Sequence, residues 1–422
     1  MGIALTAIFL MLAYLSPADL IPSLGPYRIQ LWFAALALLA GVFSIMRNPN
    51  PLRMPQVYLM LGLFFAVGLS RFSRHHPGAS LSADLNFAVS AIPFYFVLFN
   101  SGSLRALKII NMVLISVGIY LAIQGILSYI LVTHETAAVM YVYDAETGNV
   151  LRRIRGLGFL ADPNDLAQYF LIVIAILGIG LRRNSAARLT IILPVALLLV
   201  GILLTKSRGG MLGIVTFLAL TLNDKLGRVT SWVFGGVILL GLLAFNFTGG
   251  RAISMTGGAD RLAIWSDGLG KFKASPLWGI GYDQFTSGYE HTAHNSFVLC
   301  FTELGLIGYF FWLALIIYSL YQLRAIIRLE PKNDYQRDLQ RWAKGIRIAL
   351  FTFLVTSWFL SRTYNLTFYL LIAIIASLTT LMQQETRAPS LATPRKQIAV
   401  TMVAEFASIL LVYATLRARS VL

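Results

Sequence analysis

The chain has 422 residues, of which 57% are hydrophobic and only 12% are charged, and its formal net charge is +16. A soluble chain is usually about a quarter charged, and apolar stretches of membrane-spanning length recur here from end to end, which excludes a soluble globular protein. Basic cytoplasmic loops account for the positive charge, and no aromatic-basic platform favours nucleic acid as a partner. The single cysteine, Cys300, excludes an internal disulfide and a cysteine-based metal site.

The apolar stretches predict an all-α fold, a polytopic transmembrane helical bundle with about 12–13 membrane helices. In chain order the expected spans are 3–15, 30–46, 55–70, 84–100, 109–132, 166–181, 188–204, 209–222, 230–247, 296–323, 346–361 and 366–383. A last stretch, 398–416, carries Glu405, so whether it spans stays open. We expect one integral-membrane domain over 1–422, with the lipid bilayer as a partner.

Basic residues in the short loops set the expected orientation, because such loops stay in the cytoplasm. Arg182, Arg183 and Arg188 crowd one short loop, which places this loop and, by alternation, the N-terminus in the cytoplasm. Two long loops, 133–165 and 248–295, then face the periplasm. Since long loops are exempt from the charge rule, their cations do not contradict this orientation.

Several basic and imidazole side chains gather on the outward side, where topology does not call for them. They are Lys206, Arg208, Arg251, Arg261, Lys271, Lys273, Arg362, His291 and His294. Cations on the disfavoured side, close to the membrane surface, indicate an anionic ligand there.

The stretch 205–212, TKSRGGML, places Lys206 and Arg208 at a junction between two expected helices. An arginine offers a planar fork of donors that suits phosphate oxygens. Gly209 and Gly210 would let backbone N–H groups approach an anion at the start of the next helix. The pattern also fits cations that merely extend from a helix end to the membrane surface.

The stretch 259–285 opens with a pattern typical of an amphipathic helix that lies in the membrane interface. Asp260 is its expected N-cap, so Arg261 would lie in the first turn, where a cation opposes the helix dipole and needs another reason. Lys271 and Lys273 fit a lipid-anchoring helix. A Pro/Gly turn with aromatic residues follows.

Two aspartates, Asp162 and Asp165, flank the start of another expected helix. Asp162 as N-cap and Pro163 at the first helical position form a helix-start pattern of their own. Two carboxylates without a third ligand make a weak metal motif, so we expect a structural or orienting role for both and no metal.

His291 and His294 stand directly before a long apolar run that contains Glu303. The histidine pair is compatible with a metal site, an interfacial position without a role, phosphate binding or general acid/base work. His294 is the favoured base, because it directly precedes Asn295 at the mouth of the helix. Glu303 is expected to face the bundle and to pair with a cation or an amide.

Taken in order, these motifs resemble the signature of the O-antigen ligase and polymerase superfamily. The signature comprises R-x-x-x-W at 261–265, P-L-x-G-x-G at 276–281 and H-N-S-F…E-L-G-L-I-G at 294–308. S-R-G at 207–209 and D-P-N-D at 162–165 are similar to further features of these proteins. The resemblance implies an integral-membrane C-type glycosyltransferase that uses neither a nucleotide sugar nor a metal, and it requires no cofactor.

The resemblance further implies that the enzyme takes a glycan from a polyprenyl-diphosphate carrier at the periplasmic face of the bacterial inner (cytoplasmic) membrane. The acceptor is the lipid A core in an O-antigen ligase, another glycan chain in an O-antigen or exopolysaccharide polymerase, or a protein. Family functional positions fall on His294, Arg261 and Arg208. The expected substrate-binding residues beside them are Lys206, Arg362, His291, Asn295 and Arg251.

The residues themselves suit this chemistry. Arginines stabilise the charge that grows on a diphosphate leaving group, His294 removes a proton from the acceptor hydroxyl, and one direct displacement inverts the anomeric centre. An alternative from another class is a transporter or flippase for lipid-linked glycan, in which the outer cations form one end of a transport path.

Overall fold

The computed structural model describes residues 1–73, 77–131, 136–144, 148–180, 185–244, 255–287, 292–386 and 394–419. Of the residues that the structure describes, 82% are helical, which confirms the all-α polytopic fold. Four residues named above lie outside the described residues: Arg182, Arg183, Arg251 and His291.

Eight helices in the described part of the chain are long and apolar enough to cross a membrane, judged by length and composition. They are Gly2–Leu20, Pro22–Arg47, Pro55–Phe72, Ser80–Asn100, Leu104–Leu131, Ser296–Arg328, Leu366–Thr386 and Lys396–Ala418. Shorter apolar helices cover Pro163–Leu177, Thr190–Leu204, Arg208–Asn223 and Val229–Ile238. The stretch 398–416 therefore lies in a helix of spanning length despite Glu405.

The chain forms two compact units, which are described separately. Unit 1 comprises Met1–Gly41, Asn100–Ala252 and Gln340–Thr356. Its elements are α1 (Gly2–Leu15), α2 (Pro17–Leu20), η1 (Pro22–Tyr27), the start of α3 (Ile29–Arg47), α6 (Leu104–Leu131), β1 (Val139–Asp144), β2 (Asn149–Ile154), η3 (Gly158–Leu160), α7 (Pro163–Leu177), η4 (Gly178–Gly180), α8 (Ser185–Leu204), α9 (Arg208–Leu226), α10 (Arg228–Ala244) and the end of α13 (Asp334–Ser357).

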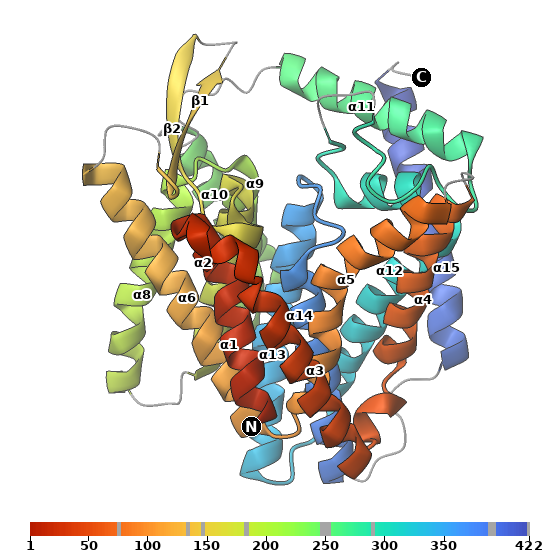
Figure 1. The fold of residues 1–422 in the computed structure, drawn as a ribbon. Coiled ribbons are helices and arrows are strands. Elements are labelled where there is room, and N and C mark those ends of the chain that lie inside the picture. The colour runs from red at the N-terminus through yellow and green to blue at the C-terminus, as the bar shows by residue number, and fades with distance from the viewer. Residues whose placement is uncertain are drawn as a thin grey trace. The chain divides into compact units, whose positions relative to one another are not determined.

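Unit 2 comprises Val42–Phe99, Ile253–Leu339 and Ser357–Leu422. Its elements are the end of α3, η2 (Asn50–Arg53), α4 (Pro55–Phe72), α5 (Pro77–Asn100), α11 (Met255–Ala274), α12 (Ser296–Arg328), the start of α13, α14 (Leu366–Thr386) and α15 (Pro394–Ala418). The helix α11 lies across the ends of α12 and α15 rather than alongside them (Figure 1). This direction supports the expected placement of α11 in the membrane interface, which stays a prediction.

Helix α7 is the centre of unit 1, where it contacts α6, α8 and α9. Glycines allow this close approach: a Cβ built on Gly210 would lie 2.9 Å from the Cβ of Ala167, and one on Gly201 would lie 2.6 Å from the Phe170 ring. Small residues at such crossings are typical of packing between membrane helices.

Helix α12 is the centre of unit 2, where it contacts α4, α11, α14 and α15. Gln56 of α4 donates to Ser319 at 3.3 Å and to Gln322, and Thr379 of α14 donates to Gln322 at 3.3 Å. These buried polar groups satisfy one another, as apolar surroundings require.

The first long loop contains a hairpin that was not predicted from the sequence. Strands β1 and β2 pair antiparallel, with Val139 opposite Ile154. The hairpin lies against α6, since a Cβ built on Gly125 would be 3.1 Å from the Cδ1 of Ile154. The pairing of the two strands therefore fixes the positions of Arg152 and Arg153 in β2.

Candidate functional site

Helix α12 is broken at Gly305, whose φ of 62° and ψ of −166° are open to glycine but not to residues with a Cβ. After the break, Leu306 N–H donates to the carbonyl of Pro276 at 2.8 Å, and Ile307 N–H donates to that of Leu277 at 3.3 Å. Backbone groups at the break are thus satisfied by the loop 275–285 that follows α11, which membrane-embedded backbone requires.

The carbonyls before the break are taken up by the same loop. The Thr302 oxygen accepts from Ile280 N–H and the Glu303 oxygen accepts from Gly281 N–H, both at 2.9 Å. A Cβ built on Gly279 would lie 2.2 Å from the Glu303 oxygen, so no larger residue fits there. The motifs P-L-x-G-x-G and E-L-G are therefore two halves of one interlocked structure.

The Glu303 side chain ties this structure to a second loop, 358–365. Its Oε1 accepts from Phe285 N–H at 3.0 Å and its Oε2 accepts from the Tyr364 hydroxyl at 2.8 Å. Glu303 is 2% exposed. The expected amide partner is thus a backbone amide, and the second partner is a phenol rather than a cation.

His294 occupies the turn that starts α12, with a left-handed φ of 46°. The next residue, Asn295, is fully buried, and its Oδ1 accepts from the N–H groups of Phe297 at 2.9 Å and Val298 at 3.1 Å. Asn295 is therefore the N-cap that fixes the His294 turn. Its expected role in substrate binding stays a prediction beside this structural one.

Ser296 fastens the loop that carries Arg362 to the His294 turn. Its hydroxyl accepts from Arg362 N–H at 2.8 Å and donates to the Leu360 carbonyl at 2.6 Å, while Thr363 donates to the Ser296 carbonyl at 2.7 Å. The backbone of Arg362 is thus held two residues from His294, although the sequence separates them widely.

The helix α11 is joined to the same turn through Trp265. The indole Nε1 donates to the carbonyl of Ala293 at 2.8 Å, directly beside His294. Arg261 lies one helical turn before Trp265, on the same face of α11. Unit 2 therefore brings the elements of Arg261, His294 and Arg362 together by direct hydrogen bonds.

One expectation about α11 is wrong. The helix begins at Met255, so Asp260 lies within it rather than at its N-cap. Arg261 is consequently in the second turn, where the dipole of the helix end has weakened. The helix dipole therefore gives no reason to expect a ligand at Arg261.

The two lysines of α11 have local partners. Lys271 Nζ lies 3.0 Å from an Asp267 carboxylate oxygen and donates to the Phe285 carbonyl at 3.2 Å. Lys273 lies over the Tyr413 ring, 5.6 Å from its centre. These contacts favour a structural role for both lysines.

In unit 1, Lys206 and Arg208 lie in the turn between α8 and α9. Lys206 has a left-handed φ of 50°, and Ser207 caps α9 by accepting from Gly210 N–H at 3.1 Å. The cap therefore uses the Gly210 N–H, and the expected approach of an anion to the Gly209 N–H stays a prediction. Gly210 is needed instead for the contact with α7.

Arg153 of β2 was not predicted from the sequence as a site residue. It is 5% exposed, and it donates through Nε to the Thr205 carbonyl at 2.7 Å and through Nη2 to Asn164 Oδ1 at 3.2 Å. The alternation of apolar and polar residues on either side of a glycine turn at 148 was the signal for this hairpin.

Asp162 has the expected N-cap role at the start of α7. Its Oδ1 accepts from Asn164 N–H at 2.7 Å, and Pro163 opens the helix. Asp165 lies in the first turn and is buried. Among the described residues, no three His, Cys, Asp or Glu side chains form a group that could hold a metal ion.

The ammonium group of Lys206 lies in surroundings that disfavour its positive charge. Burial, and after it the nearby positive charge of Arg153, lower the pKa of Lys206 from its ordinary value of 10.5. An anion bound beside Lys206 would offset both effects.

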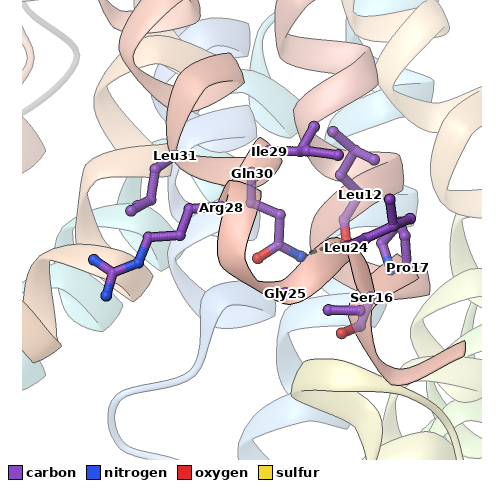
Figure 2. A pocket seen from close by; sticks show the side chains of 10 residues that line it. Leu12, Ser16, Pro17, Leu24, Gly25, Arg28, Ile29, Gln30 and Leu31 are labelled. Atoms are coloured by element: carbon purple, nitrogen blue, oxygen red, sulfur yellow. Dashed lines mark hydrogen bonds between the residues drawn. The ribbon is translucent and has the colours of Figure 1, made fainter. Parts of the chain in front are cut away.

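Unit 1 also contains a cavity of about 260 Å³ between the end of α1, η1 and the start of α3 (Figure 2). Gln30 crosses it to donate to the Leu12 carbonyl, and the Arg28 side chain points away from Gln30 (Figure 2). The remaining walls are mostly apolar, and no sequence-predicted site residue lines it.

Residues 193–313, from α8 to the middle of α12, match a protein-family model described as O-antigen ligase. A search of curated proteins finds no match. The matched range contains Lys206, Arg208, Arg261 and His294, and it confirms the superfamily resemblance. It supports a multi-pass membrane glycosyltransferase of the O-antigen ligase or polymerase type.

Proposed function

We propose that this protein is a member of the O-antigen ligase superfamily and that it transfers a glycan from a polyprenyl-diphosphate donor to the lipid A core, at the periplasmic face of the bacterial inner membrane. The family match supports the reaction class. The assignment of the site rests on one observation: hydrogen bonds through Trp265 and Ser296 fasten the elements of Arg261 and Arg362 to the His294 turn.

In the proposed reaction, His294 takes the proton of the acceptor hydroxyl as its oxygen attacks C1 of the donor sugar. The bond between C1 and the diphosphate oxygen breaks, and the polyprenyl diphosphate leaves with that electron pair. Arg261 and Arg208 stabilise the growing negative charge, and Lys206 and Arg362 bind donor oxygens. A single displacement of this kind inverts the anomeric centre and requires no metal.

The test uses cells that lack the chain and are complemented with full-length variants. We expect His294→Ala and Arg208→Ala to fold, to leave the lipid A core without glycan and to accumulate lipid-linked glycan. Lys273→Gln is the matched control, since it removes an outer cation that stacks on Tyr413, and it should transfer normally. Normal glycan attachment in both site variants would overturn the proposal.

The product ladder of the deletion identifies the acceptor. Loss of all attachment supports the ligase, whereas loss of long chains with single units still attached identifies a polymerase and overturns the lipid A core as acceptor. Purified protein that moves lipid-linked glycan across liposomes without forming a bond would identify a transporter.

A further inference from the structure

The guanidinium of Arg153 joins two turns that lie far apart in the sequence. Buried arginines are rare unless their donors are used, and Arg153 uses Nε on Thr205 and Nη2 on Asn164. Asn164 belongs to the first turn of α7 and Thr205 precedes Lys206 in the turn before α9. Arg153 thus holds the Lys206 turn against the start of α7.

The neighbouring arginines of the hairpin have different partners. Arg152 donates to the Ser128 carbonyl at 3.0 Å and lies over the Tyr129 ring at 4.8 Å. Arg155 donates to the Thr136 carbonyl at 3.4 Å. The bonds to the two turns therefore belong to Arg153, and Arg152 provides a matched control one residue away.

The Lys206 turn needs such support. A left-handed backbone is unfavourable for a residue with a Cβ, so the φ of 50° at Lys206 persists only if its surroundings hold it. Thr205 Oγ1 accepts from Ser207 N–H at 3.3 Å on one side of the turn. Arg153 adds a second hydrogen bond to this turn, through the Thr205 carbonyl.

Arg153 also places a second positive charge beside Lys206. Lysine and arginine repel each other there, which is part of the reason that the pKa of Lys206 is lowered. An anion bound beside Lys206 offsets this repulsion, and phosphoryl oxygens suit the point charge of a lysine.

We infer that Arg153 is a positioning residue of an anion site centred on Lys206, and that the anion is a phosphoryl group of the donor diphosphate. The identity of this ligand rests on the proposed function. Arg153 acts through the turn and through its charge, and Lys206 contacts the ligand. Arg153 lies outside the range of the family match, so the match does not assign this role.

The experiment measures binding of inorganic pyrophosphate to the purified full chain in detergent, together with KM and kcat for the lipid-linked donor. We expect Arg153→Gln to raise the pyrophosphate Kd and the donor KM by about tenfold, with kcat changed less than about twofold, as for losing one charged hydrogen bond. Arg153→Lys should fall between the wild type and Arg153→Gln, and Arg152→Gln should match the wild type.

Thermal unfolding checks that the variants fold. If Arg153→Gln does not fold, Asn164→Ala is the second variant: it removes the Nη2 acceptor but keeps the backbone N–H that Asp162 accepts, and a smaller rise in Kd is expected. A folded Arg153→Gln, or Asn164→Ala in its place, with wild-type Kd and KM overturns the inference. An equal rise of Kd and KM in Arg152→Gln also overturns it. So does inhibition of donor binding by glucuronate but not by pyrophosphate.

These outcomes separate the inference from the proposed function. If His294→Ala and Lys206→Ala abolish transfer while Arg153→Gln leaves Kd and KM unchanged, only the role of Arg153 is overturned. If His294→Ala and Arg208→Ala transfer normally, the proposed function falls, whereas the pyrophosphate binding still tests the anion site directly.

Discussion

The Tyr364 hydroxyl donates to Glu303 Oε2 at 2.8 Å, and this bond joins the loop of Arg362 to the break in α12. Burial, and after it the charge of Glu303, raise the pKa of Tyr364 well above its ordinary value. Tyr364 therefore stays protonated, and remains a donor, throughout the neutral pH range. Because Glu303 also accepts from Phe285 N–H, one carboxylate joins the loop 275–285 to the loop of Arg362.

We predict that Tyr364→Phe lowers the free energy of unfolding by about 1–3 kcal/mol, because it leaves a buried carboxylate oxygen without its donor. Transfer should fall with it, since the loop of Arg362 loses an anchor. Thermal unfolding in detergent and the donor KM measure the two effects. Tyr335→Phe is the control, because Tyr335 is exposed at the start of α13. Unchanged stability and KM in Tyr364→Phe would contradict the orienting role of Glu303.

Alanine at the interlocked glycines should be far more damaging than alanine elsewhere in unit 2. A Cβ on Gly305 would lie 2.4 Å from the Leu277 carbonyl, and one on Gly279 would meet the Glu303 backbone, both at positive φ. Neither backbone can yield without breaking the hydrogen bonds at the kink, so Gly305→Ala and Gly279→Ala should unfold at markedly lower temperature and lose transfer.

Gly270→Ala is the matched control for these variants, because its Cβ would meet nothing within 4 Å and the site lies in α11. Alanine in a helix is about 0.5–1 kcal/mol more favourable than glycine, so this variant should be equal to or more stable than the wild type. Equal loss of stability in all three variants would show that the interlock is unimportant.

Helix positions could be predicted closely from the sequence, because a hydrocarbon environment demands long apolar runs and each expected span overlaps a helix. The break at Gly305 could not, since a glycine inside an apolar run is compatible with an unbroken helix. Its cause is a set of bonds to Pro276 and Leu277, which no local pattern encodes.

The candidate site shows the same limit. Charge and topology identified Lys206, Arg261, His294 and Arg362, because cations on the outer side are unusual. Arg153 could not be found in this way, because no motif or expected helix start in the loop 133–165 distinguishes it from Arg152 and Arg155. Its importance depends on two hydrogen bonds across the fold that only the structure reveals.

We predict that the charge of Lys206 lowers the free energy of unfolding but strengthens binding of the donor. Its folded pKa lies below 10.5, so between the two values the unfolded chain binds more protons, and the free energy of unfolding rises as pH increases through that window. Below the window the buried charge is a cost. We therefore predict that Lys206→Gln raises Tm at pH 7 while it weakens donor binding, whereas Lys206→Arg keeps binding at alkaline pH. Lower Tm in Lys206→Gln at pH 7 would contradict this assignment.

The orientation can be tested through the cysteine content of the chain. Cys300 is the single cysteine and is buried, so Cys300→Ala yields a cysteine-free background with a small change in volume. The charge rule places the loop after α11 in the periplasm and the connection between α12 and α13 in the cytoplasm. In that background, Leu277→Cys, at a site 54% exposed, should react with a membrane-impermeant maleimide added to cells with a permeable outer membrane. Asp338→Cys should react only after the inner membrane is broken. The reverse pattern would place the His294 turn on the cytoplasmic side, where a periplasmic acceptor cannot reach it.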